Sequence, residues 1–244
     1  MIDAEAPALV FDEIDSTNSE AQRRADAGET GPLWLRAHSQ TAGRGRRGRR
    51  WASQHGNLFT TYFARFEAGP AQLARLSFAA ALAVADVADA AGAAPVTLKW
   101  PNDVLIGGAK CAGILLESGA HKGGGTWLAL GIGVNLLSAP DDAAYPVAAL
   151  GGLDADAAFA LLRQRLAAWS ARLEREGFAP LQAAWLARAH GLGRPIRVDL
   201  GREAVEGLHG GLSESGELRL LRPDGREALI SAGEVFFSAD SPAA

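Results

Sequence analysis

The chain has 244 residues, of which 48% are hydrophobic and 21% charged, and its formal net charge is −4. This composition excludes wholesale disorder, and the length fits one large domain or a domain with a small companion. The acidic balance excludes a generally basic nucleic-acid-binding protein. A single cysteine, Cys111, excludes an intramolecular disulfide framework, and we interpret it as a small core residue rather than a nucleophile.

We expect no segment of the sequence to cross a membrane. The most apolar stretch, residues 78–91, contains Asp86 and Asp89 and is shorter than the roughly 18 charge-poor residues that a spanning helix needs. The first residues are acidic and lack a long apolar core, which is not the pattern of a signal peptide. The sequence therefore predicts a cytoplasmic protein.

Apolar periodicity and turn residues predict a mixture of helices and strands over the first 190 residues. Helices are expected at 17–27, about 73–92, 155–176 and 180–189. Strands are expected at 33–37, 58–66, 96–100, 104–106, 110–117 and 127–135. For the first helix, the spacing of Thr17 and Glu20 predicts a capping box with Thr17 as N-cap, and Gly28 follows the helix end.

The composition changes near Gly193, after which short apolar runs alternate with glycine turns. Strands are expected at 195–200, 204–212, 217–221 and 228–237. Several strands in so short a segment indicate a small β-barrel. We therefore expect an α+β protein: a mixed β-sheet with helices over residues 1–192, followed by a barrel over residues 193–238.

Five arginines and no acidic residue lie between Arg44 and Arg50, so positive charge is concentrated on an otherwise acidic chain. The segment formally matches G-x-G-x-x-G, but no apolar helical period follows it, which argues against a dinucleotide-binding turn. Glycines allow backbone N–H groups to surround an anion, and arginines supply forked cationic donors. The alternative is a solvated or RNA-binding arginine-glycine tract.

Three further segments have a functional and a purely structural interpretation. Asn102 and Asp103 follow a strand-ending proline, where they could hold Mg²⁺ with a ribose or phosphate, or form an ordinary Asx turn. Lys110 begins an apolar strand, so it either is partly buried beside an anionic partner or extends into water. The glycines of residues 131–135 let a ligand or another strand approach closely.

Taken together and in this order, the segments resemble the biotin protein ligase family. The resemblance is strong over about residues 8–140 and rests on architecture beyond that. The matching segments are Asp15-Ser16-Thr17-Asn18, residues 40–49 from Gln40 to Arg49, Lys99-Trp100-Pro101-Asn102-Asp103, Lys110-Cys111-Ala112-Gly113 and Gly131-Ile132-Gly133-Val134-Asn135. The family implies a biotin/lipoate ligase-like catalytic domain, with the barrel being SH3-like.

The resemblance implies an ATP-dependent ligase that converts biotin to biotinyl-5′-AMP and then transfers biotin to a lysine of an acceptor protein. Lys110, Arg46 and Arg44 are implied as catalytic residues, with Lys110 acting electrostatically. The implied biotin-binding residues are Ser16, Thr17, Asn18, Gln40, Gly43, Arg44, Gly45, Arg46, Lys110 and Gly113. The implied nucleotide-binding residues are Arg46, Arg49, Trp51, Asn102, Asp103, Lys110 and Asn135, with Asp103 as the Mg²⁺ ligand.

The implied acceptor is a biotin carboxyl carrier protein or domain of acetyl-CoA carboxylase and related enzymes. Because the Ser-Thr-Asn segment starts at residue 16, the sequence resembles the monofunctional class without an N-terminal DNA-binding domain, so we expect no specific DNA binding. We expect a monomer or a homodimer. Two other functions stay open: a lipoate ligase or lipoyl/octanoyl transferase of the same fold, and an RNA-binding module that uses the arginine segment.

Overall fold

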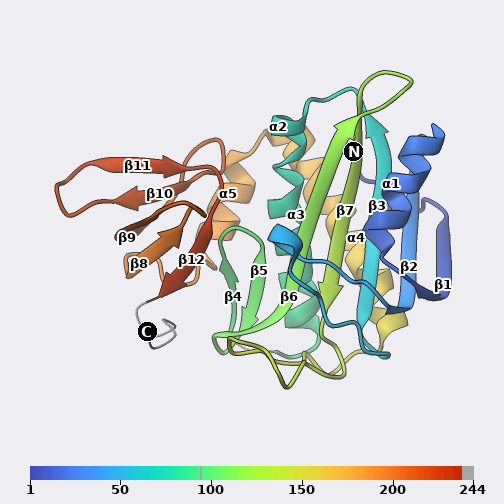
Figure 1. The fold of residues 1–244 in the computed structure, drawn as a ribbon, viewed down its shortest axis with the longest axis horizontal. Coiled ribbons are helices and arrows are strands. Elements are labelled where there is room, and N and C mark those ends of the chain that lie inside the picture. Colours follow the sequence, from blue (N-terminus) through green and yellow to red (C-terminus); the bar gives the residue numbers. More distant parts are fainter. Residues whose placement is uncertain (94, 238–244) are drawn as a thin grey trace.

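The computed structural model describes residues 1–93 and 95–237, and within them seven strands form one mixed sheet (Figure 1). Their spatial order is β1-β2-β3-β7-β6-β5-β4. The strands are β1 (Ala8–Ile14), β2 (Leu33–Gln40), β3 (Leu58–Phe66), β4 (Val96–Lys99), β5 (Asp103–Ile106), β6 (Ala109–Ala120) and β7 (Thr126–Val134). β1 and β2 pair in parallel, and the other described neighbours pair antiparallel. The mixed sheet expected from the sequence is confirmed.

Helix α1 (Thr17–Ala27) connects β1 to β2 and packs on one face of the sheet. It ends at Gly28, whose φ of 91° is a left-handed conformation that glycine adopts without steric cost. The predicted N-cap is wrong by one residue. Ser16 has the extended backbone of a cap and accepts the N–H of Ser19, because the Thr17 side chain is held by Gln40 instead.

The opposite face of the sheet is covered by α3 (Leu76–Ala90), with α4 (Ala155–Glu176) and α5 (Ala179–Leu186) packed against α3. Helix α3 is apolar almost all round because it lies between the sheet and these helices. The single helix expected over residues 73–92 is interrupted: α2 (Pro70–Leu73) is a separate turn before α3.

By length and composition, the helical run Pro70–Ala90 is apolar enough to cross a membrane, contrary to the sequence-based estimate for this region. In the structure, 67% of the relevant window is buried inside the protein. The hydrophobicity of this run is therefore accounted for by its place in the core.

Five further strands form an antiparallel sheet in the described C-terminal residues, in the order β11-β10-β9-β8-β12. They are β8 (Pro195–Asp199), β9 (Ala204–Leu212), β10 (Leu218–Leu221), β11 (Glu227–Ile230) and β12 (Glu234–Phe237). The strand expected over residues 228–237 is thus two strands, separated by a turn. This sheet is the small C-terminal domain expected from the sequence. We propose that it begins at residue 193; residue 238, its expected end, lies outside the described residues.

The small domain packs beside the β4–β5 edge of the large sheet (Figure 1). The indole N–H of Trp100 donates to the carbonyl of Gly216 at 3.2 Å, and the rings of Phe78 and Phe178 contact next to that glycine. One hydrophobic core runs through both domains. The start of β12 is thereby held near the arginine-rich segment that follows β2.

We predict that Leu82→Ala in α3 lowers the free energy of unfolding by about 2–5 kcal/mol, because the side chain is only 1% exposed and its removal leaves a cavity. Urea denaturation measures the change. Leu229→Ala is the control, since its side chain is 53% exposed and should change stability by less than about 0.5 kcal/mol. Equal losses in the two variants would contradict the assignment of α3 as the central core helix.

Candidate functional site

The sheet face that carries α1 is hollowed because small residues stand opposite one another on neighbouring strands. Gly113 of β6 pairs with Gly133 of β7, and Gly131 of β7 lies between Leu115 and Thr61. Residues paired across antiparallel strands point to the same side of the sheet. The three glycines therefore leave space on one patch of this face.

A pocket opens over this patch and collects residues from segments that are far apart in the sequence. The site residues expected from the sequence that line it are Ser16, Thr17, Asn18, Gln40, Arg44, Gly45, Arg46, Arg49, Trp51, Asn102, Lys110 and Gly113. Three expected site residues lie next to the pocket rather than in its lining: Gly43, Asp103 and Asn135.

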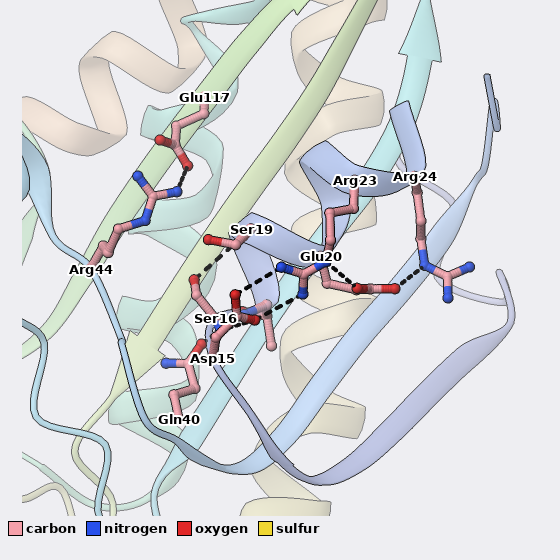
Figure 2. Close-up of polar contacts among 10 residues, drawn as sticks. Asp15, Ser16, Ser19, Glu20, Arg23, Arg24, Gln40, Arg44 and Glu117 are labelled. Atoms are coloured by element: carbon pink, nitrogen blue, oxygen red, sulfur yellow. Dashed lines mark hydrogen bonds and ion pairs between the residues drawn. The ribbon is translucent and has the colours of Figure 1, made fainter. Parts of the chain in front are cut away.

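One end of the pocket is built from the start of α1 and the end of β2 (Figure 2). The backbone N–H and the hydroxyl of Thr17 both donate to Gln40 Oε1, at 2.8 and 3.2 Å. The Gln40 Nε2 group donates to Ser53 Oγ at 3.0 Å, and Ser16 is buried as the cap of α1. This end presents neutral polar groups whose orientations are fixed by one another.

Asn18 is held by three hydrogen bonds at the same end. Its Oδ1 accepts from the Thr61 hydroxyl at 2.6 Å, and its Nδ2 donates to the Leu115 carbonyl at 3.1 Å and to Glu117 Oε2 at 2.8 Å. A Cβ atom on Gly131 would lie 2.2 Å from Asn18 Oδ1. Asn18 can therefore occupy this position only because residue 131 is glycine.

A network of ion pairs on the protein surface supports the start of α1 (Figure 2). Both Nη atoms of Arg23 donate to the Asp15 carboxylate at 2.8 Å, and Arg23 Nε donates to Glu20 at 2.9 Å. The hydrogen bond from Arg23 is the largest cause of the lowered pKa of Asp15. Asp15 thus stays ionised and fixes the segment that carries Ser16.

The arginine loop, residues 43–51, closes on itself. The Trp51 N–H donates to the Gly43 carbonyl at 2.9 Å, and the Gly45 N–H donates to the Arg49 carbonyl at 2.7 Å. A Cβ on Gly43 would meet Ser53 Oγ at 2.5 Å, so this glycine serves the closure rather than the pocket lining.

The far side of the arginine loop rests on the C-terminal domain. Arg49 pairs with Glu234, and Arg47 lies 3.7 Å from Asp199 and 3.9 Å from Glu234. Arg46 Nη1 donates at 3.3 Å to the backbone carbonyl of the residue before Glu234. These partners offset the mutual repulsion of the loop arginines.

The near side of the arginine loop contacts β6, where Arg44 Nη2 lies 3.2 Å from Glu117 Oε2 (Figure 2). Arg46 is more buried than its neighbours, and this burial lowers the pKa of its guanidinium. A cation in this environment interacts more strongly with an incoming anion than one in water. The loop therefore presents positive charge to the pocket.

Lys110 lines the pocket, next to two aromatic rings. Its Nζ is 2.7 Å from Asp103 Oδ1, and the two side chains are 14% and 21% exposed. The same Nζ lies 5.3 Å from the Trp51 ring centroid and 5.4 Å from the Tyr145 ring centroid. The expectation of a partly buried lysine with an anionic partner is confirmed.

Trp51 lies over the paired glycines of the sheet. A Cβ on Gly133 would be 2.7 Å from its indole, and one on Gly113 would be 3.0 Å from it. Within the described residues, the indole N–H of Trp51 is buried and has no hydrogen-bond partner. A buried donor without a partner is unfavourable, so it offers a binding group to a ligand with an acceptor.

The other expected residues hold the walls of the pocket. Asn102 Nδ2 donates to the Ile114 carbonyl at 2.7 Å, and Asn135 Nδ2 donates to the Ala148 carbonyl at 3.3 Å. Asn135 lines an adjoining cavity together with Lys110, Trp51 and Tyr145. Lys99 of the same motif lies outside the pocket, 5.6 Å from the ring of Phe237.

Cys111 is buried, and burial raises the pKa of its thiol to about 12. A thiol with such a pKa stays protonated near neutral pH, and the thiolate is the reactive form. The interpretation of Cys111 as a core residue is therefore supported.

Sequence reasoning missed four residues that complete the site: Ser53, Thr61, Glu117 and Tyr145. Thr61 and Glu117 sit on strands whose apolar pattern they interrupt, and that interruption was the available signal. Ser53 and Tyr145 lie in segments between the strands and helices, where the sequence carries no periodicity to place them.

The arrangement can bring two anions together beside a neutral polar end, because Lys110 and the loop arginines converge on one pocket. Within the described residues, no group of three or more His, Cys, Asp or Glu side chains is placed to hold a metal ion by itself.

Comparison with known proteins gives two family matches. The model of the Biotin/lipoate A/B protein ligase family matches residues 10–135, and that of the Biotin protein ligase C terminal domain matches residues 191–238. The first match covers the pocket segments up to Asn135, and the second covers the small domain.

Among curated relatives, the biotin–[acetyl-CoA-carboxylase] ligase of Paracoccus denitrificans is 45% identical over 235 residues, which cover 91% of this chain and 97% of the relative. The bifunctional ligase/repressor BirA of Escherichia coli is 34% identical over 230 residues, covering 91% of this chain and 71% of that protein. The structure is similar to that of biotin protein ligase from Aquifex aeolicus in complex with biotin and ATP, with a TM-score of 0.78, 26% identity and coverage of 95% and 99% of the two chains.

We predict that Gly131→Ala destabilises the protein by about 1–3 kcal/mol, because the new methyl group forces Asn18 out of its network. Thermal or urea unfolding measures the loss. In an Asn18→Ala background the same substitution should be tolerated much better, since the clashing Oδ1 is gone. An equal loss in both backgrounds would show that the close approach to Asn18 is not what requires the glycine.

Proposed function

The chain belongs to the biotin/lipoate A/B protein ligase family, and on that premise we propose that it is an ATP-dependent biotin protein ligase. It activates biotin as biotinyl-5′-AMP and transfers biotin to a lysine of a biotin carboxyl carrier protein or domain. The Paracoccus denitrificans relative is named as a biotin ligase and the Aquifex aeolicus structure as a biotin protein ligase with biotin and ATP, so the lipoate alternative is not favoured.

One observation carries this proposal. A single pocket joins a neutral hydrogen-bonding end at Thr17 and Gln40 to a cationic end at Arg46 and Arg49, with Lys110 lining it between aromatic rings. Biotin has a neutral ureido ring and a carboxylate, and ATP carries a triphosphate. The polarity of the pocket matches this pair of substrates.

We assign the biotin end to the α1 start, β2 end and the first part of the arginine loop. Ser16, Thr17 and Gln40 supply donors and acceptors for the ureido ring, in a setting where their own hydrogen bonds limit rotation. Arg44, Gly45, Arg46 and Gly113 line the pocket beyond them. Gly43 contributes by closing the loop.

We assign the nucleotide end to the loop arginines, Trp51, Asn102 and the adjoining cavity that reaches Asn135. Arg46 and Arg49 bind the phosphates, and the unpaired indole N–H of Trp51 donates to the nucleotide. Lys110 neutralises the carboxylate and the α-phosphate where they meet.

The first step needs neither a general base nor a covalent enzyme intermediate. A biotin carboxylate oxygen attacks the α-phosphorus, the bond to the oxygen that bridges to the β-phosphate breaks, and pyrophosphate leaves with that electron pair. In the second step the neutral amine of the acceptor lysine attacks the anhydride carbonyl. AMP leaves, the amine gives up a proton, and an amide forms.

Mg²⁺ fits the residues present. Asp103 holds Lys110 through Oδ1, which leaves Oδ2 as a donor, and Mg²⁺ commonly takes one or two protein carboxylates with substrate phosphates and waters. We propose Asp103 as its protein ligand, and the bound ion would neutralise phosphate charge.

The proposal includes the setting of the enzyme. We propose a cytoplasmic protein that binds no specific DNA and acts as a monomer or homodimer. The net charge of −4 supports the absence of general DNA affinity, and the burial of Pro70–Ala90 agrees with a protein that needs no membrane.

The proposed function is tested by pyrophosphate release from Mg·ATP with purified protein and either biotin or lipoate. We expect release that depends on biotin, and label transfer to a biotin carboxyl carrier domain but not to the same domain with its acceptor lysine replaced by arginine. Lipoate-dependent release without biotin-dependent release would overturn the assignment of the substrate. RNA binding, with no ATP turnover that depends on biotin or lipoate, would overturn the assignment of the protein as an enzyme.

We predict that Lys110→Ala lowers the rate of biotinyl-5′-AMP formation by about 10²–10³-fold, the scale of losing one preorganised electrostatic donor. Biotin binding, measured by calorimetry, should change less than turnover. Lys122→Ala is the matched control because this exposed lysine donates to the backbone carbonyl of Asp26 and lies outside the pocket. A rate for Lys110→Ala within a few-fold of the wild type would remove Lys110 from the mechanism.

A further inference from the structure

Glu117 is a partly buried carboxylate beside the pocket whose role the proposed reaction does not explain. It belongs to β6, pairs across the sheet with Ala129 and is 31% exposed. Its Oε2 atom accepts from Asn18 Nδ2 at 2.8 Å and lies 3.2 Å from Arg44 Nη2. One oxygen atom thus joins the start of α1 to the first arginine of the loop, and Figure 2 shows its contact with Arg44.

The side-chain hydrogen bonds of Asn18 show how the Glu117 carboxylate is held. A carboxamide has two N–H donors, and those of Asn18 go to the Leu115 carbonyl and to Glu117. Its oxygen already accepts from Thr61. Both N–H donors of Asn18 are thus used within the protein, and one of them orients the Glu117 carboxylate.

The conformation of the arginine loop depends on the position of Arg44. Arg44 forms a backbone bridge to Arg50, so its place fixes the base from which the rest of the loop extends. The far side of the loop is held by Glu234 of the C-terminal domain. Glu117 is the corresponding carboxylate on the near side.

From this geometry we infer that Glu117 is a positioning residue that holds Arg44, and through it the arginine loop, closed over the biotin end of the pocket. The inference rests on the proposed function for its consequence: a closed loop retains biotinyl-5′-AMP until the acceptor lysine arrives. Glu117 does not line the pocket and takes no part in bond formation.

Glu117→Gln tests the ion pair specifically. Glutamine keeps an oxygen that accepts from Asn18 but loses the negative charge that holds Arg44. We expect the arginine bonds of the loop in the ligand-free full-length protein to be cut by trypsin about 3- to 10-fold faster, the size expected for a partly exposed ion pair. Glu117→Asp, which keeps the charge, should restore part of the protection.

The activity readout separates positioning from catalysis. In Glu117→Gln we expect release of free biotinyl-5′-AMP and biotinylation of a bystander protein such as serum albumin to rise by about 3- to 10-fold, with a raised KM for biotin and a smaller change in kcat for adenylation. Glu227→Gln is the matched control, because it breaks a similarly exposed pair with Arg219 in the C-terminal domain. That control should leave cleavage, leakage and KM unchanged.

A double-mutant cycle decides whether Glu117 acts through Arg44. In an Arg44→Ala background, Glu117→Gln should add little to either cleavage or leakage. Full additivity, or wild-type protection and retention in Glu117→Gln at unchanged melting temperature, would overturn the inference. The trypsin arm requires no activity, so an inactive wild type would refute the proposed function while still giving a result for Glu117.

Discussion

The structure depends on holding many positive charges in one small volume. Four loop arginines and Lys110 line a single pocket, and each would repel the others in the absence of counter-charges. The fold supplies these charges from separate elements: Glu117 from β6, Asp103 from β5, and Glu234 and Asp199 from the C-terminal domain. The small domain is therefore part of the electrostatics of the site, since its acids hold one side of the arginine loop in place.

A second constraint is the absence of side chains where the ligand and its covering residues must approach the sheet. Gly131 admits Asn18, and the facing pair Gly113 and Gly133 admits the indole of Trp51. These positions share one face because paired residues on antiparallel strands point the same way. The opposite face packs on α3 and has large apolar side chains. The sheet is thus a core on one side and the floor of a pocket on the other.

Much of the fold and of the candidate site could be predicted from the sequence. The elements and residues that were missed or misplaced have physical causes. Strand 58–66 and helix 155–176 follow clear periodicities and have the expected bounds. β1 was missed because its residues are largely exposed and it owes its place to pairing with β2. The cap of α1 was misplaced because Thr17 bonds to Gln40, a contact across 23 residues. Motif residues located the pocket, but Glu117, Thr61 and Tyr145 act through tertiary contacts that no short motif records.

The most direct test of the account is a crystal structure of the protein with biotinyl-5′-AMP, determined beside the ligand-free crystal. We expect the ureido ring to lie against Thr17 and Gln40, and the phosphate to lie within hydrogen-bond distance of Lys110 Nζ and an arginine of the loop. We also expect Arg44 to remain paired with Glu117. Binding of the adenylate outside this pocket, or with its phosphate remote from both Lys110 and the loop arginines, would contradict the central claim that this cluster of cations is the site where carboxylate and phosphate meet.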